Sequence, residues 1–167
     1  MEIEIVAMAE NHLDAVMDIE QHSFISPWSR NLFYHELATP ISRSFVAVVR
    51  LPDVRAVAGY MCSWIVYEHC NILKCACHPH YRRQGIGRRL LQHGLQDAWQ
   101  RGALTASLEV RPSNTGALQF YAACGFRHAG VRKGYYQETR EDAIIMVKNL
   151  AEHCDSAQTV TPTDLIS

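Results

Sequence analysis

The chain has little net charge and no long hydrophobic run. Its 16 lysine and arginine residues nearly balance 17 aspartate and glutamate residues, which leaves a net charge of −1 at pH 7. A surface of this kind offers no overall attraction to nucleic acid or to anionic lipid, so any polyanion must be bound locally. No apolar run approaches the length of a membrane-spanning helix. We therefore expect neither a direct nucleic-acid partner nor a membrane partner.

The sequence also lacks the features of a secretory signal and of a disulfide-linked protein. The opening residues MEIEIVAMAE include acidic residues and lack the basic start and apolar stretch of a secretory signal. The 6 cysteines could pair, but the sequence is neither short nor of secreted type, so reduced thiols are expected. The sequence thus predicts a cytoplasmic protein.

The composition is that of one globular domain. The 167 residues are 48% hydrophobic and 20% charged, which suffices for one sizeable core, and no repeat or linker divides them. We expect a single domain over residues 1–150. Residues 151–167 are polar and lack a period, so a flexible tail is expected there.

Hydrophobic periodicity predicts a mixed α/β layer structure. Asn11 and Ser29 are expected N-caps of the first two helices, and Ser113 or Asn114 of the last. Strands are expected at 2–8, 44–50, 56–68, 69–77, 104–110, 126–136 and 141–150, and helices at 11–24, between Ser29 and Pro40, at 85–101 and at 113–124.

The segment CACHPHYRRQGIG, residues 75–87, has the residue types of a metal site. A structural zinc site takes four ligands, typically from C-x2-4-C pairs on tight turns. Here the spacing is C-x-C, and no second CxxC or HxxxH follows. We expect no metal. Small, half-buried strand residues are the ordinary role of such free cysteines.

The second half of the same segment is typical of an anion site. Arg82 to Gly87 would join a strand to the start of a helix, where backbone N–H groups lack partners and the helix dipole is positive. Glycines allow a diphosphate to approach those donors, and arginines add charge. The run is neither a P-loop nor the dinucleotide fingerprint. Taken alone, such a run is more often a solvated helix cap.

Further motifs indicate a family. R-x-x-G-x-G at 82–87, directly after a strand, resembles the pyrophosphate-binding motif of the GNAT superfamily of N-acetyltransferases. The run SLEVRPSNTGALQFYAACGFRHAGVRKGYY at 107–136 is similar to the RimI-type N-terminal alanine acetyltransferases of bacteria, as are SPWS at 26–29 and EDAIIM at 141–146. The resemblance covers about residues 2–148.

The resemblance implies a GNAT (acyl-CoA N-acyltransferase) fold: a mixed central sheet flanked by helices and splayed between two parallel strands, here 69–77 and 104–110. Acetyl-CoA is the implied acetyl donor, bound in the gap. This sequence departs from the usual pattern in having Cys75, Cys77 and His78 where aliphatic and acidic residues are common, but those contacts are mainly through the backbone. The implied cofactor-binding residues are Cys75, Ala76, Cys77, Arg82, Arg83, Gln84, Gly85, Ile86, Gly87, Arg88 and Asn114.

The resemblance also implies a catalytic pair. Glu109 corresponds to the family's proton acceptor and Tyr121 to its proton donor. The Cys77 N–H is a further candidate, as a donor to the developing oxyanion. From the residues alone, Glu109 could instead pair with Arg111, and Tyr121 could be an ordinary core tyrosine.

The implied acceptor is a protein or peptide N-terminus. Trp28, Tyr135 and Tyr136 are expected to border its groove, although Trp28 could simply cover the helix pair. The RimI subgroup implies the N-terminal alanine of a small-subunit ribosomal protein. Two alternatives stay open: a GNAT enzyme acting on lysine, a polyamine or another small amine, and a silent acyl-CoA-binding module.

Overall fold

The computed structural model describes residues 1–151 of the chain. Residues 152–167, and with them nearly all of the expected tail, lie outside the described part. The strands are β1 Glu2–Ala7, β2 Ser42–Leu51, β3 Val54–Val66, β4 His69–Cys77, β5 Thr105–Val110, β6 Arg127–Tyr136 and β7 Glu141–Asn149, and the α-helices are α1 Leu13–Ser23, α2 Arg30–Ala38, α3 Ile86–Gln100 and α4 Thr115–Ala123.

The strands form one seven-stranded sheet with the order β1-β2-β3-β4-β5-β7-β6. The pair β4–β5 is parallel, and the other neighbouring strands are antiparallel. A parallel pair needs a crossover connection, which α3 provides. The sequence-based prediction of a mixed α/β structure with this order of elements is therefore confirmed.

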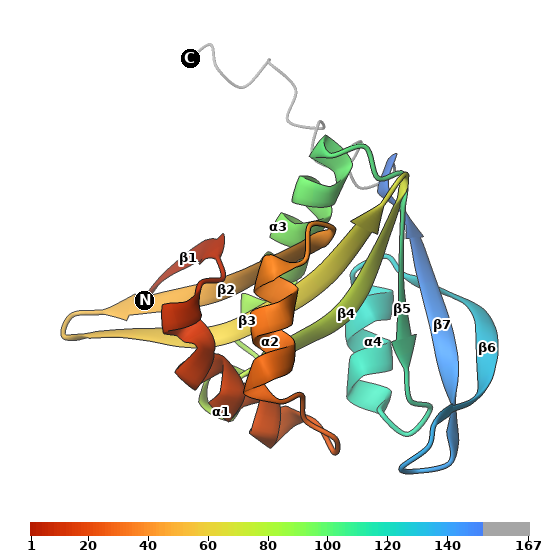
Figure 1. Ribbon diagram of the computed structural model, residues 1–167, viewed down its shortest axis with the longest axis horizontal. Helices are drawn as coiled ribbons and strands as arrows, with labels where there is room; N and C mark the ends of the chain where they lie inside the picture. Colours follow the sequence, from red (N-terminus) through yellow and green to blue (C-terminus); the bar gives the residue numbers. More distant parts are fainter. Residues whose placement is uncertain (152–167) are drawn as a thin grey trace, which may run out of the picture.

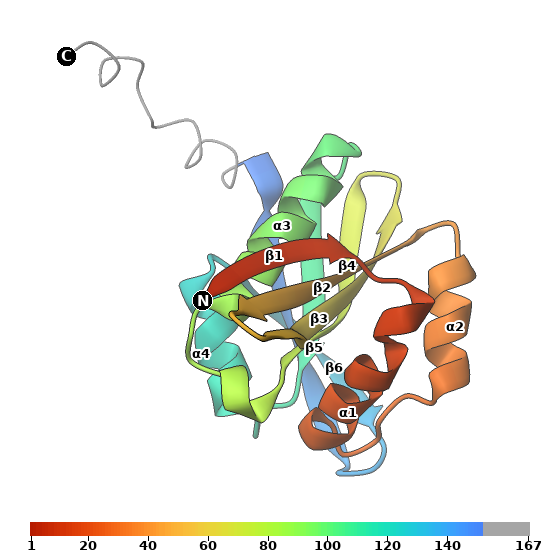
Figure 2. The same cartoon turned by 90° about the vertical axis from the view of Figure 1, so that its left-hand side faces the viewer.

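Helices cover both faces of the sheet (Figure 2). One hydrophobic cluster joins α3 and α4 to the sheet, with Leu90, Leu95 and Tyr121 among its buried members. A second cluster lies under α1 and α2 and contains Val16, Phe33 and Tyr60, among others. None of the helices in residues 1–151 is long and apolar enough to cross a membrane.

Most of the expected helix ends are confirmed, with one exception. Ser29 Oγ accepts a hydrogen bond from the Leu32 N–H, and Asn114 Oδ1 accepts one from the Ala117 N–H, so both act as N-caps. Asn11 does not cap α1, so that prediction is wrong. Residues 10–12 instead form a short 3-10 turn, and α1 begins one residue after it.

Two features separate β4 from β5. The two strands pair only from His69 to Asn71, opposite Thr105 to Ser107, and then diverge, as Figure 1 shows. On the other side of β4, the register with β3 shifts between Cys62 and Ser63, which leaves Leu73 as an extra residue in β4. A bulge of this kind bends its strand and increases the local twist. The sheet therefore opens in its middle.

The absence of a side chain at Gly59 allows β3 to lie close to β4 and α3. A Cβ atom at this position would lie 2.9 Å from the Ala76 carbonyl oxygen and 3.0 Å from Leu90 Cδ1. By contrast, a Cβ at Gly116, in α4, would meet no atom within 4 Å. The two glycines therefore differ in what a methyl group would do.

We predict that Gly59→Ala lowers the free energy of unfolding by about 1–3 kcal/mol, because overpacking pushes β3 away from the Ala76 carbonyl. Gly116→Ala is the matched control, and it should leave stability unchanged or raise it by about 0.5–1 kcal/mol. Urea denaturation of the two variants measures both values. Equal effects of the two substitutions would contradict this packing argument.

Candidate active site

A cavity of about 460 Å³ occupies the opening between β4 and β5. Its walls come from both strands, from α4, from the loop between α1 and α2, from the end of β6 and from the turn that follows it. It brings together the following predicted site residues: Trp28, Cys75, Glu109, Asn114, Tyr121, Tyr135 and Tyr136. These residues are distant in sequence, so their common location supports one site.

Strand β5 directs Glu109 toward the face covered by α1 and α2. Its neighbours Leu108 and Val110 are buried in the opposite cluster, and alternation sends Glu109 the other way. The Glu109 side chain is 16% exposed, and its Oε1 lies 3.8 Å from Arg132 Nη1. The alternative pairing with Arg111 is not found, because Arg111 lies beside Glu138 instead, with Nη2 3.6 Å from Oε2.

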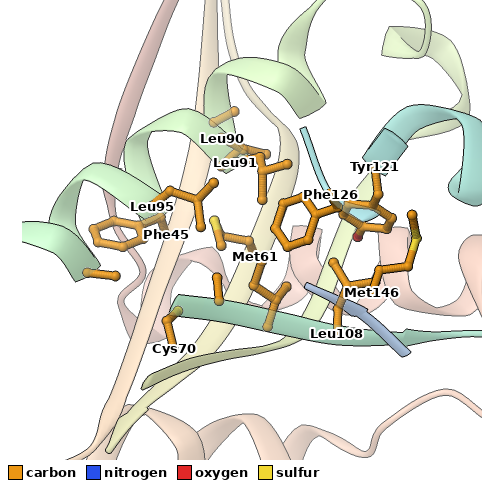
Figure 3. Packing of buried hydrophobic residues seen from close by; sticks show 14 of the residues in the cluster. Phe45, Met61, Cys70, Leu90, Leu91, Leu95, Leu108, Tyr121, Phe126 and Met146 are labelled. Atoms are coloured by element: carbon orange, nitrogen blue, oxygen red, sulfur yellow. The ribbon is translucent and has the colours of Figure 1, made fainter. Parts of the chain in front are cut away.

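Tyr121 reaches the cavity from the opposite face. Helix α4 places its ring in the core, where Figure 3 shows it with Leu108, Phe126 and Met146. The residue is 8% exposed and also lines the cavity, so its ring belongs both to the core and to the cavity wall. Burial raises the pKa of Tyr121 well above its usual value of 10. The phenol is therefore protonated at neutral pH and can donate a proton.

The free edge of β4 presents backbone donors to the opening. The His78 N–H donates to the Ala58 carbonyl at 2.8 Å, which directs it toward β3. Successive N–H groups of an extended strand point to opposite edges. The N–H groups of Cys75 and Cys77 therefore point away from β3, toward the opening. This geometry suits a donor to an oxyanion.

The start of α3 has the geometry of an anion site. Gly85 is the N-cap at φ 80°, and no side chain caps the helix there. Arg83 also has a positive φ, of 63°. Left-handed residues in such a turn form a concave nest of N–H groups, and the first amides of a helix lack intrahelical partners. The amides of residues 86–88 are thus placed to bind a diphosphate.

Side chains within this segment differ in what they do. Arg82 Nε donates to the Cys77 carbonyl at 3.0 Å, and its Nη2 lies 3.3 Å from Ser23 Oγ, so Arg82 ties the loop to β4 and α1. Gln84 Nε2 donates to the His80 carbonyl at 3.2 Å. The Ile86 side chain is buried in the core. The side chains of Arg83 and Arg88 are exposed and remain available to an anion.

The anion site adjoins the free edge of β4. A Cβ atom at Gly87 would lie 3.6 Å from Cys77 Sγ and 3.5 Å from Phe120 Cζ. Helix α3 therefore begins against both β4 and α4, near the opening of the sheet. An extended ligand with a diphosphate at one end and a reactive group at the other fits this arrangement. The chain thus has residues that suit acetyl-CoA.

Sequence reasoning missed a buried ion pair beneath the cavity. Glu20 is fully buried and accepts hydrogen bonds from Lys74 Nζ, from the Tyr60 hydroxyl and, at 2.8 Å, from the Trp28 N–H. Lys74 lines the cavity, and its Nζ lies 3.8 Å from the ring centroid of Phe24. Burial lowers the pKa of Lys74, and the Glu20 carboxylate opposes that shift. The sequence signal that could have revealed this pair was Glu20 itself, a glutamate among the apolar positions of the helix predicted over 11–24.

Cys75 and Cys77 have the environment of unreactive thiols. Burial raises the pKa of Cys77 to about 11, and it raises that of Cys75 further. Both side chains contact the cluster under α3 and α4. Within residues 1–151, no group of three or more His, Cys, Asp and Glu side chains is arranged to hold a metal ion.

Comparison with known proteins gives consistent results. The model of the acetyltransferase (GNAT) family matches residues 13–126. A protein from Bacillus subtilis (strain 168) is 37% identical over 134 residues, which are 80% of this chain and 87% of that protein. A protein from Escherichia coli (strain K12), named [ribosomal protein bS18]-alanine N-acetyltransferase, is 35% identical over 144 residues, 85% of this chain and 94% of its own length.

A solved structure has the same fold. The crystal structure of the ribosomal-protein-S18-alanine N-acetyltransferase from Escherichia coli superposes with a TM-score of 0.78 and 32% sequence identity. The comparison covers 89% of this chain and 94% of that chain. The shared fold therefore extends over most of this chain and of that chain.

The Glu20–Lys74 pair gives a prediction about stability. Glu20→Gln should lower the free energy of unfolding by roughly 3–5 kcal/mol, because it leaves the Lys74 ammonium buried without a counter-charge. The double variant with Lys74→Met should lose much less than the sum of the two single losses. Urea denaturation of all three variants measures the coupling.

Asp14→Asn is the control for this cycle. Asp14 pairs with Arg30 at the surface, with a side chain that is 92% exposed, so its loss should leave the unfolding midpoint unchanged. If Glu20→Gln also left the unfolding midpoint unchanged, the buried pair would not contribute to stability, and the prediction would be wrong.

Proposed function

This chain belongs to the acetyltransferase (GNAT) family, and on that premise we propose that it transfers an acetyl group from acetyl-CoA to the N-terminal α-amine of a protein. We propose further that the acceptor is the N-terminal alanine of the small-subunit ribosomal protein bS18, as the names of its relatives suggest. The chain is an acetyltransferase and has the GNAT fold. The observation that carries the proposal is the cavity, where Glu109 and Tyr121 meet from opposite faces of the opened sheet.

The acetyl thioester of acetyl-CoA supplies the group to be transferred. Its diphosphate would rest on the amides of residues 86–88, and its pantetheine arm would run along the free edge of β4 beside Asn114. Of the N–H groups of Cys75 and Cys77, which lie about 7 Å apart and cannot both reach one oxygen, one would then donate to the carbonyl oxygen as negative charge develops there. The side chains at 75 and 77 are free to vary, because these contacts use the backbone.

Proton transfer is divided between the two faces. Glu109 accepts the proton that the acceptor nitrogen loses as its bond to the acetyl carbon forms, directly or through one water. Tyr121 gives a proton to the sulfur as the carbon–sulfur bond breaks. The two groups act on different atoms, so Glu109 must be ionised and Tyr121 must be protonated in the same complex. The raised pKa of Tyr121 meets the second requirement.

An α-amine is the acceptor that such a site serves best. Its pKa of about 7.7–8.0 leaves roughly a tenth of it neutral at pH 7. A lysine side chain has a pKa of about 10.4, so its neutral fraction at pH 7 is smaller than that of an α-amine by a factor of roughly 250 or more. The cavity lining also balances Lys74 and Arg111 against Glu109 and Glu138, which gives no excess of carboxylates for a polyamine.

The acceptor is tested by mass spectrometry. Peptides that differ only in the first residue, together with spermidine and an internal lysine peptide, are incubated with acetyl-CoA and the enzyme. We expect acetylation at the N-terminal α-amine, with alanine preferred in a peptide carrying the bS18 N-terminus. Acetylation of the small amines alone would defeat this proposal.

The proton donor is tested by Tyr121→Phe. We predict a fall in kcat of about tenfold or more with acetyl-CoA affinity nearly intact, because the ring still fills its place in the core and only the hydroxyl is lost. Steady-state kinetics with titration of acetyl-CoA binding measures both quantities. Unchanged turnover would remove Tyr121 from the mechanism.

A further inference from the structure

Two buried polar atoms in the cavity have no partner within the protein. In the described part of the chain, the buried side-chain atoms without a hydrogen bond are Ser44 Oγ, Asn71 Oδ1, Arg111 Nη1 and Thr139 Oγ1. Asn71 and Arg111 both line the cavity. Buried polar groups in native proteins are satisfied by protein, water or ligand, so these two atoms mark where a bound molecule can complete the bonding.

Arg111 holds its free N–H in a defined direction. Its guanidinium carbon lies 4.4 Å from the ring centroid of Tyr136, and Nη2 lies 3.6 Å from Glu138 Oε2. The side chain is only 18% exposed. Stacking and ion pairing thus fix the plane of the guanidinium, while Nη1 remains without an acceptor. A guanidinium is always charged and only donates, so its partner must be an oxygen or another acceptor.

The position of Arg111 relates it to the reacting amine. It follows Val110, the last residue of β5, and stands two residues from Glu109. Residues two apart in an extended chain share a face and have Cα atoms about 7 Å apart. An amine held at Glu109 therefore has its nearest carbonyl group within reach of the long Arg111 side chain.

We propose that Arg111 Nη1 donates a hydrogen bond to the carbonyl oxygen of the acceptor's first residue. Arg111, which is not one of the catalytic pair, would then recognise the carbonyl group that follows an N-terminal amine. Asn71 Oδ1, where β4 and β5 still pair, offers the complementary acceptor to an N–H on the amine side. This inference rests on the proposed function, because it presupposes a peptide acceptor.

On this assignment, amines without a neighbouring carbonyl group should be poor substrates. A lysine side chain or a polyamine has only methylene groups beside the reacting nitrogen. Such an acceptor leaves Arg111 Nη1 unpaired, and a polyamine brings a second cation toward the guanidinium. Loss of one partner of a buried hydrogen bond to a charged group is more damaging than loss of a neutral contact.

The test compares three acceptors on the unaltered enzyme. The first is an N-terminal alanine peptide. The second replaces its first peptide bond by a trans alkene, which removes the carbonyl and the N–H. The third replaces it by an ester, which keeps the carbonyl and removes only the N–H. We expect kcat/KM to fall by roughly tenfold or more for the alkene, and the ester to stay within about threefold of the peptide.

A variant of Arg111 completes a double-mutant cycle in which the second change is the alkene in the acceptor. Arg111→Met should lower kcat/KM for the peptide by roughly tenfold or more and cause little further loss for the alkene. Arg127→Met, at an exposed position of β6, is the matched loss of an arginine and should leave both acceptors unaffected. Acetyl-CoA affinity and the thermal midpoint report whether the Arg111 variant is folded.

The outcomes separate the two proposals. If the enzyme acetylates the alkene as well as the peptide, the role of Arg111 is overturned and the proposed function stands. If Arg111→Met lowers both rates by the same factor, the arginine is structural and the inference is again overturned. If no peptide is acetylated and small amines are, the proposed function and the inference both fall.

Discussion

The early separation of β4 from β5 is the constraint on which the site depends. The two strands share three residues of parallel pairing and then part, leaving the backbone groups of each without a strand partner on that side. Unpaired backbone in the middle of a sheet is unfavourable unless a ligand or water satisfies it. The opening is stable because β3 and β7 hold the outer edges of the two strands and because the helices pack over both faces. It makes one cavity accessible to Glu109 from one face and to Tyr121 from the other.

The charged side chains around the opening form ion pairs, and some of these pairs are more deeply buried than others. Glu20 and Lys74 form the deepest pair, and Glu20 also accepts the Trp28 N–H, so this pair couples α1 to the loop that borders the cavity. Arg132 and Arg111 lie nearer to the solvent, beside Glu109 and Glu138. Each carboxylate has a cation within reach, and the site as a whole is close to neutral. A neutral site suits an acceptor that must lose a proton before it reacts.

Local patterns were sufficient to predict the elements, and tertiary contacts explain what those patterns missed. Alternation identified β4 and β5, and the glycine-rich turn identified the start of α3, because these signals lie within a few residues. The resemblance of the LEVR and SNT runs placed Glu109 and Asn114 at the same site. No local signal could show that Glu20 meets Lys74, which is 54 residues away, or that Arg82 turns to Ser23, which is 59 residues away. The cap expected at Asn11 failed because a 3-10 turn precedes α1.

A crystal structure with a conjugate of CoA and an alanine peptide, joined through an acetyl linker at the α-amine, tests the account most directly. The account places the diphosphate on the amides of residues 86–88, the linker between Cys75 and Glu109, and the peptide on the side of Trp28 and Tyr136. A conjugate bound instead in the groove of about 690 Å³ between α3 and the end of α4, with the opening of the sheet empty, would contradict it.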